Sequence, residues 1–272
     1  MGSITGVLIG TVFIFSGIEL GPQQIEVLKA RHLYEAYLRS ETLRVVKPYL
    51  ALSAVAILWA LLILCTKFPS IQSEHEAGGD RGHFRELFHY PHFWMAVVAQ
   101  FMYVGAQVGT WSYFIQYVQK FTNQPEKIAG YFLTGTLAAF GIGRFSSAWL
   151  MRFVQPNILL GAYAVVNVVL VLVAFGILHP GWAGLWAVFA TSFFMSLMFR
   201  TIFALRLKGL GPNTKIGGSL IVMAIVGGAV LTPLMRLISE ARHSIAPAYV
   251  VPLAAYMLIA GYAFTGAKAR CP

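Results

Sequence analysis

Long apolar runs separated by short polar turns dominate the 272-residue chain. A helix needs about 20 apolar residues to cross the hydrocarbon core of a bilayer. By this measure the sequence predicts eight transmembrane helices, at residues 2–18, 47–66, 93–118, 129–151, 157–177, 182–207, 216–238 and 246–266. Glycine, proline or asparagine marks the breaks between them, as helix ends favour. The pattern therefore indicates an all-α membrane protein that spans the lipid bilayer.

Two of the breaks are longer than a turn. Residues 19–46 are charged and predict a partly helical connector, and residues 67–92 are polar and predict a solvated loop. The first predicted span, residues 2–18, begins inside its own apolar run, and the first basic residue is Lys29. A secretory signal peptide would carry a positive charge before its apolar segment. We therefore expect that part of a longer protein is missing upstream of this segment.

The composition agrees with a membrane protein. The chain is 58% hydrophobic and 11% charged, and its mean hydropathy is +0.70. The net charge of +10 would attract nucleic acid if it formed one basic face, but the basic residues are spread over short loops. We therefore expect no nucleic-acid partner. Loop lysines and arginines orient membrane proteins instead, and setting aside the first connector they favour cytoplasmic ends.

The predicted spans contain no set of residues that would carry catalysis or bind a metal. No serine–histidine set, aspartate pair or metal-ligand cluster falls inside one, so the sequence predicts neither an enzyme nor a metal site. Cys65 and Cys271 have no ligand or redox spacing and are expected to be free thiols.

Proton coupling needs an ionisable group inside the membrane that gains and loses a proton. None of the ten acidic residues is central in a predicted span, and all seven histidines fall in loops or at span edges. The spans of this chain therefore offer no good coupling residue.

Neutral polar and aromatic residues give candidates for binding a polar small molecule. Tyr103, Gln107 and Trp111 follow one another at i, i+4 and i+8, which places them on one face of a helix. Amides and hydroxyls match sugar hydroxyls, and aromatic rings stack on the C–H faces of a sugar. The candidate substrate-binding residues are Tyr103, Gln107, Trp111, Ser112, Tyr113 and Asn167. Helix packing or interfacial anchoring explains each of them as an alternative.

A glycine-rich stretch lies in the seventh predicted span. Gly227 and Gly228 allow close helix packing, and Pro233 can kink the helix. A hinge for alternating access is the other interpretation of these three residues.

Several segments resemble the fucose:proton symporter family of the major facilitator superfamily. They are "LLILCTKFPSIQ" (61–72), "AQFMYVGAQVGTWSYFIQY" (99–117), "YFLTGTLAAFGIGRF" (131–145), "TIFALRLKGLG" (201–211) and "GGSLIVMAIVGGAVLTPLM" (217–235). Members of that family have twelve spans in two halves. The resemblance implies that residues 1–66 hold the last two helices of the N-terminal half, joined by the outer connector 19–46, and that the first four helices are missing. It also implies that residues 67–92 are the central cytoplasmic loop and that residues 93–272 form the C-terminal six-helix half of a major facilitator fold.

The resemblance also implies a function. It implies proton symport of a fucose-like hexose by alternating access in the bacterial inner membrane, with both ends of the full-length protein cytoplasmic and with no cofactor besides the coupled proton. The family's coupling acids are understood to lie in the first half, among the helices expected to be missing. We therefore expect this chain alone to be unable to couple protons. A non-transporting membrane remnant, a subunit or a sensor is the alternative.

The arginines inside or next to the spans need their own explanation. Arg144 and Arg152 in "GRFSSAWLMRF" resemble a reduced form of the motif by which the superfamily latches its two halves together, although its aspartate is missing. Arg200, Arg206 and Arg236 depart from the family pattern. Arg200 lies about 9 Å below Arg206 along a helix, so its guanidinium can reach the membrane interface.

Overall fold

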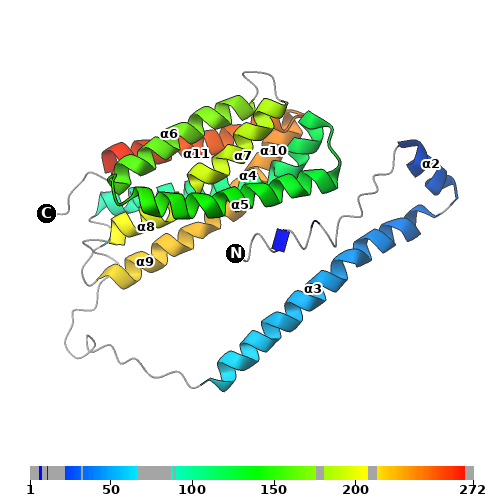
Figure 1. The fold of residues 1–272 in the computed structure, drawn as a ribbon, viewed down its shortest axis with the longest axis horizontal. Coiled ribbons are helices and arrows are strands. Elements are labelled where there is room, and N and C mark those ends of the chain that lie inside the picture. The colour runs from blue at the N-terminus through cyan, green and yellow to red at the C-terminus, as the bar shows by residue number, and fades with distance from the viewer. Residues whose placement is uncertain are drawn as a thin grey trace. The chain divides into compact units, whose positions relative to one another are not determined.

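The computed structural model describes residues 6–7, 11, 22–31, 33–66, 87, 90–175, 181–207 and 213–266 (Figure 1). All the regular elements in this part of the chain are helical. They are α2 (Pro22–Ala30), α3 (Tyr34–Cys65), α4 (Pro91–Thr122), α5 (Glu126–Leu150), α6 (Pro156–Phe175), α7 (Trp182–Met195), α8 (Met198–Leu207), α9 (Thr214–Met223), the 3₁₀ turn η5 (Ala224–Val226), α10 (Gly227–Ala241), the 3₁₀ turn η6 (Ala246–Tyr249), α11 (Val250–Gly261) and the π turn η7 (Tyr262–Gly266).

Six helical segments of the described residues are long and apolar enough to cross a membrane. They are Val46–Cys65, Glu126–Leu150, Pro156–Phe175, Trp182–Leu205, Ile216–Ala241 and Ala246–Thr265. They coincide with six of the eight predicted spans, so the chain is a multi-pass membrane protein. The predicted span 93–118 forms α4, which is long enough but carries several glutamines. Most of the predicted span 2–18 and of the loop 67–92 lies outside the described residues.

The chain divides into two compact units. One comprises Met1–Gly78 with Pro125–Tyr131, and the other comprises Gly79–Gln124 with Phe132–Pro272. In the first unit, none of the apolar stretch of α3 is buried. The sequence predicted a boundary between the connector 19–46 and a span that begins at residue 47. In the structure, α3 begins at Tyr34 and continues without a break through this boundary, with Pro48 inside the helix. A helix that is apolar on all sides needs lipid or other helices around it.

In the second unit, α4 is the central helix. It packs against α7, α8, α10 and α11, while α6 packs against α7 and α11. Proline at its first position and Asn123 in the left-handed region after its last residue define the ends of α4. The buried Tyr117 on α4 donates a hydrogen bond to the carbonyl oxygen of Ala174 (2.9 Å) and packs its ring against Tyr249 (5.2 Å between centroids). These contacts join α4 to α6 and to η6.

Two predicted spans are interrupted rather than continuous. The span predicted at 182–207 is split into α7 and α8 by a turn at Ser196 and Leu197, and the span predicted at 216–238 is split by η5. The sequence pattern does not show these breaks, since the residues on both sides stay apolar. Irregular backbone at membrane depth is tolerated where protein buries it or where it lines a cavity.

Glycines bring α4 and the η5–α10 segment into close contact. A Cβ atom on Gly227 would overlap the carbonyl oxygen of Phe101, and one on Gly105 would overlap Leu231. Gly228, the second glycine of the predicted packing pair, would place a Cβ 3.0 Å from Val108. Pro233 lies inside α10 with an exposed side chain. Close backbone approach through small residues is the usual way for helices to pack in lipid.

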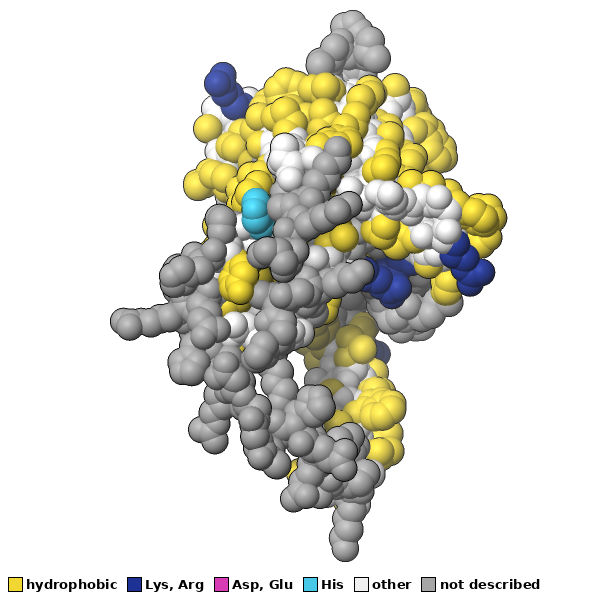
Figure 2. Space-filling view, turned by 90° about the vertical axis from the view of Figure 1, so that its left-hand side faces the viewer, with side chains coloured by type: hydrophobic (Ala, Val, Ile, Leu, Met, Phe, Trp, Pro, Cys, Tyr) yellow, Lys and Arg dark blue, Asp and Glu magenta, His cyan; other side chains and the backbone are white. Residues whose placement is uncertain are grey.

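Large apolar side chains remain exposed on the second unit. On and just after α5 they include Ile142 (62% exposed), Phe145 (76%), Trp149 (60%) and Phe153 (70%). Hydrophobic side chains also make up most of the described surface in Figure 2, with few lysines and arginines among them. Such a surface is suited to contact with lipid tails or with further helices.

Candidate functional site

The predicted binding face of α4 is only partly open. Tyr103 is 1% exposed, and its ring meets the ring of Phe199 on α8 edge to face, with 6.3 Å between the centroids. Its hydroxyl is buried and has no hydrogen-bond partner among the described residues. Tyr103 therefore lies inside the bundle rather than on its surface.

Trp111, two turns further along the same face, is fixed by two neighbours. Its indole Nε1 donates a hydrogen bond to Oγ of Ser192 on α7 (3.2 Å). Its ring meets Phe140 of α5 edge to face, with 5.1 Å between the centroids and an 86° angle between the planes. The indole is half-buried and held between α4, α5 and α7. A ring held in one orientation offers a ready stacking surface.

The remaining candidates on α4 point in different directions. Gln107 is half-buried, Ser112 is exposed and Tyr113 is 9% exposed. At about 100° per residue, Ser112 lies roughly 180° around the helix from Tyr103. The structure therefore brings Gln107 and Trp111 onto one edge of α4 but does not gather all the predicted residues into one cluster.

Asn167 lies on α6 and is completely buried. Neither atom of its side-chain amide has a hydrogen-bond partner among the described residues. A buried polar group without a partner costs about 1–3 kcal/mol. The same condition holds for other buried polar side chains of the bundle, which include Gln100, Thr110, Tyr249 and Tyr256.

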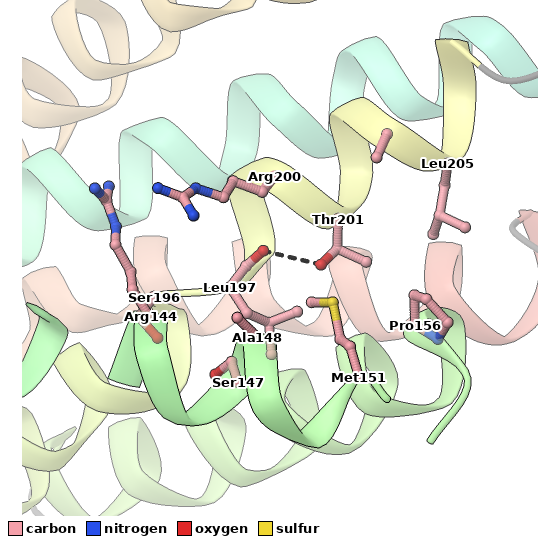
Figure 3. A pocket seen from close by; sticks show the side chains of 11 residues that line it. Arg144, Ser147, Ala148, Met151, Pro156, Ser196, Leu197, Arg200, Thr201 and Leu205 are labelled. Carbon is pink, nitrogen blue, oxygen red and sulfur yellow. Dashed lines mark hydrogen bonds between the residues drawn. The ribbon is translucent and has the colours of Figure 1, made fainter. Parts of the chain in front are cut away.

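A cavity of about 530 Å³ lies between the end of α5, the beginning of α6 and the α7–α8 break. Figure 3 shows its lining, in which Arg144 extends from α5 and Arg200 from α8. Ser147 and Ser196 also line it. The sequence singled out Arg144 as part of a latch motif and Arg200 as a departure from the family pattern. It did not indicate that they share one cavity, because that depends on how α5 and α8 are placed.

Arg144 connects this cavity to the α4 face. Its guanidinium carbon lies 4.5 Å from the centre of the Phe140 ring, and Phe140 in turn packs against Trp111. Cations over aromatic faces are attracted by the ring quadrupole. Arg152, predicted to act with Arg144, is exposed in the turn after α5 and does not line the cavity.

Arg236, which also departs from the family pattern, makes a separate contact outside the cavity lining. Nε of Arg236 on α10 contacts Oε1 of Glu240 at 2.7 Å, and both side chains are exposed. The side chain of Arg206 is outside the described residues. In the described part of the chain, Cys65 is exposed and unbonded, and no three histidine, cysteine or acidic residues gather into a metal site.

The chain is similar in sequence to bacterial sugar transporters, although it matches no protein-family profile. It is 38% identical to the L-fucose-proton symporter of Escherichia coli over 95% of its own length and 60% of that protein's length. It is 29% identical to a glucose/galactose transporter of Brucella abortus over 81% of its length and 53% of that protein's length. The chain thus spans about 60% of the first of these relatives.

A solved structure has a similar fold. The crystal structure of a major facilitator superfamily transporter, FucP, in the outward conformation matches 98% of this chain and 66% of its own chain. The TM-score is 0.72 and the sequence identity is 36%. The similarity therefore extends over both the sequence and the fold.

Proposed function

Since the chain belongs to the fucose:proton symporter family of the major facilitator superfamily, we propose that it forms part of a secondary active transporter for a fucose-like hexose. The observation that carries this proposal is the similarity to an L-fucose-proton symporter over 95% of the chain. Residues 93–272 would then be the C-terminal six-helix half, and residues 1–66 would hold the last helices of the N-terminal half. The transporter would lie in a bacterial inner membrane with both of its ends cytoplasmic.

The edge of α4 that carries Gln107 and Trp111 is the proposed sugar contact in this half. The indole ring, held by Ser192 and Phe140, can stack on the apolar face of a hexose. The half-buried amide of Gln107, one turn away, can both donate to and accept from sugar hydroxyls. The breaks at η5 and between α7 and α8 are suited to the bending that alternating access needs.

Proton coupling is proposed to need residues beyond those of this chain. In the described part of the chain, two acidic residues lie close to a span. They are Glu126 at the start of α5 and Glu240 near the end of α10, and both are at helix ends. Such positions are reached by water and do not provide a proton site within the membrane. The chain would therefore contribute sugar contacts and the packing of one half, while coupling acids come from preceding helices.

Sugar binding to the purified 272-residue chain tests the first part of the proposal. We expect L-fucose, D-galactose or D-glucose to change the tryptophan fluorescence in a saturable way. Trp111→Phe should abolish most of that change, whereas Trp149→Phe, a matched substitution at an exposed ring of α5, should leave it intact. If none of the three sugars produces a saturable change, the chain is better described as a non-transporting remnant, subunit or sensor.

Uptake by proteoliposomes tests the second part. With an imposed inward proton gradient, we expect the 272-residue chain not to accumulate radiolabelled L-fucose, because its spans offer no good proton site. A longer protein that also carries the helices preceding this region in its relatives should accumulate the sugar. Proton-driven accumulation by the 272-residue chain alone would contradict the proposed division of roles.

A further inference from the structure

The cavity between α5 and α8 has the size of a ligand site. Its volume of about 530 Å³ falls within the range of roughly 300–1,000 Å³ that is usual for small-molecule sites. Arg144 lies about 9 Å before the last residue of α5 and Arg200 about 10.5 Å before the last residue of α8, at 1.5 Å per residue, and the lining extends to Met151 in the turn after α5 and to Pro156 at the start of α6. The cavity is therefore built by the described core of the second unit and close to one end of the bundle.

The charge of this cavity is not balanced by its own lining. Arg144 and Arg200 both contribute to it, and its lining contains no aspartate or glutamate. Both side chains are exposed, and Figure 3 shows their guanidinium groups on the same side of the cavity. Two like charges in an apolar bundle disfavour each other, so an anion between them is favourable.

Two buried hydroxyls provide an independent sign of a ligand. Ser147 on α5 and Ser196 at the α7–α8 break are each 1% exposed, and both line the cavity. Neither Oγ has a hydrogen-bond partner among the described residues. Most threonines of the same helices, by contrast, bond back to a carbonyl of the preceding turn, as Thr201 does to Leu197 (3.0 Å). Ser147 and Ser196 are thus donors without an acceptor in the lining that also contains the two arginines.

The rest of the lining is apolar. Met151, Leu197 and Leu205 are among the apolar side chains that line it. Arginine forks match the tetrahedral oxygens of a phosphate and can each donate two hydrogen bonds to it. A basic pocket between transmembrane helices near one membrane surface is also a recognised form of lipid headgroup site.

We propose that this cavity binds a phosphate group through Arg144 and Arg200, with Ser147 and Ser196 as additional hydrogen-bond donors. The phosphate is carried by an anionic phospholipid, whose glycerol and acyl atoms contact the apolar walls, or is free in solution. Because Arg144 also stacks on Phe140, which packs against Trp111, the site adjoins the proposed sugar contact without sharing residues with it.

Thermal unfolding of the 272-residue chain in dodecyl maltoside tests this site. The additives are dioleoylphosphatidylglycerol, dioleoylglycerol as the same lipid without phosphate, and sodium phosphate at matched ionic strength. A ligand that binds the folded state raises the midpoint temperature of unfolding, and this increase saturates with ligand concentration. We expect phosphatidylglycerol to do so and dioleoylglycerol not to. A response to phosphate alone would identify the free anion as the source.

Variants test whether the rise in the unfolding midpoint comes from binding in the cavity. Arg144→Ala and Arg200→Ala should each weaken the apparent affinity roughly tenfold or more, since each removes charge-assisted hydrogen bonds. Ser147→Ala and Ser196→Ala should weaken it several-fold. Arg242→Ala is the matched control, because it removes one exposed arginine at the C-terminal end of α10, outside the cavity lining. It should leave the affinity unchanged.

Three results would overturn the proposal. They are an equal response to dioleoylglycerol, no response to either phosphate source, and a response that Arg144→Ala and Arg200→Ala leave intact. If an alanine variant fails to fold, Arg200→Lys and Arg144→Lys keep the charge and remove the fork, and lipid retention is then counted by native mass spectrometry. Retention equal to that of the unchanged chain would also contradict a site built on the two arginines.

Discussion

The seam between α4 and α10 and the region between α5 and α8 differ in how closely their helices pack. Glycines such as Gly105 and Gly227 bring the first pair of segments so close that a single methyl group would overlap the partner. Arginines and serines line the second region, and a cavity of about 530 Å³ remains there. Helices in lipid are held by close contact and by polar groups. The first region is therefore close-packed, and the second has space and polar groups for a polar ligand.

The difference teaches where function is to be expected in the bundle. Tight glycine contacts leave no room for a ligand, so the α4–α10 seam is a packing contact between helices. A region with unpaired polar groups is held less firmly by its own side chains and can accept external partners. Substitutions in the two regions should consequently have unlike effects on stability and on binding.

The largest effect is expected for Gly227→Ala. The new Cβ would overlap the backbone carbonyl of Phe101, which a rotamer change cannot relieve. Overpacking a well-packed site destabilises by about 1–3 kcal/mol or more, so the unfolding midpoint in detergent should fall clearly. Gly261→Ala is the matched control, because no heavy atom lies within 4 Å of its Cβ position. Equal midpoints for the two variants would refute the description of the α4–α10 seam as close-packed.

A medium effect is expected for Ser192→Ala. This change removes the acceptor of the Trp111 indole hydrogen bond and leaves the ring contact with Phe140 in place. The loss of one hydrogen bond destabilises by about 1 kcal/mol. The tryptophan emission of the variant should also shift relative to that of the parent. Thr191→Ala, whose hydroxyl bonds to a carbonyl of its own helix, serves as the neighbouring control. An unchanged emission would mean that the hydrogen bond does not hold the indole.

The smallest effect on stability is expected for Ala204→Leu. Ala204 is exposed and lines the cavity, so the added atoms occupy open space rather than overlap a neighbour. The unfolding midpoint should change by an amount equivalent to less than about 0.5 kcal/mol. The response to phosphatidylglycerol should nevertheless weaken, because the larger side chain narrows the site. A loss of stability as large as that of Gly227→Ala would show that the cavity is closed in the folded protein.

The sequence alone located six of the membrane-spanning segments and indicated that lipid surrounds them. The length and apolar character of runs such as 129–151 and 157–177 are local properties, and a bilayer leaves a continuous helix as the favoured way to satisfy their backbone. The positions of Tyr103, Gln107 and Trp111 on one helix face also followed from spacing alone. Long matching segments in the right order were enough to identify the family by resemblance.

Only the tertiary structure decided which of these residues are buried, fixed or brought together. Trp111 and Ser192 are 81 positions apart, and their hydrogen bond depends on how α4 and α7 pack. Arg200 is a charge in a predicted span, and the placement of α5 beside α8 brings it into one cavity with Arg144. Helical periodicity fixes the angle of a side chain around its own axis but carries no information about the neighbouring helix. The proposed anion site therefore depends on packing that no local pattern in the sequence contains.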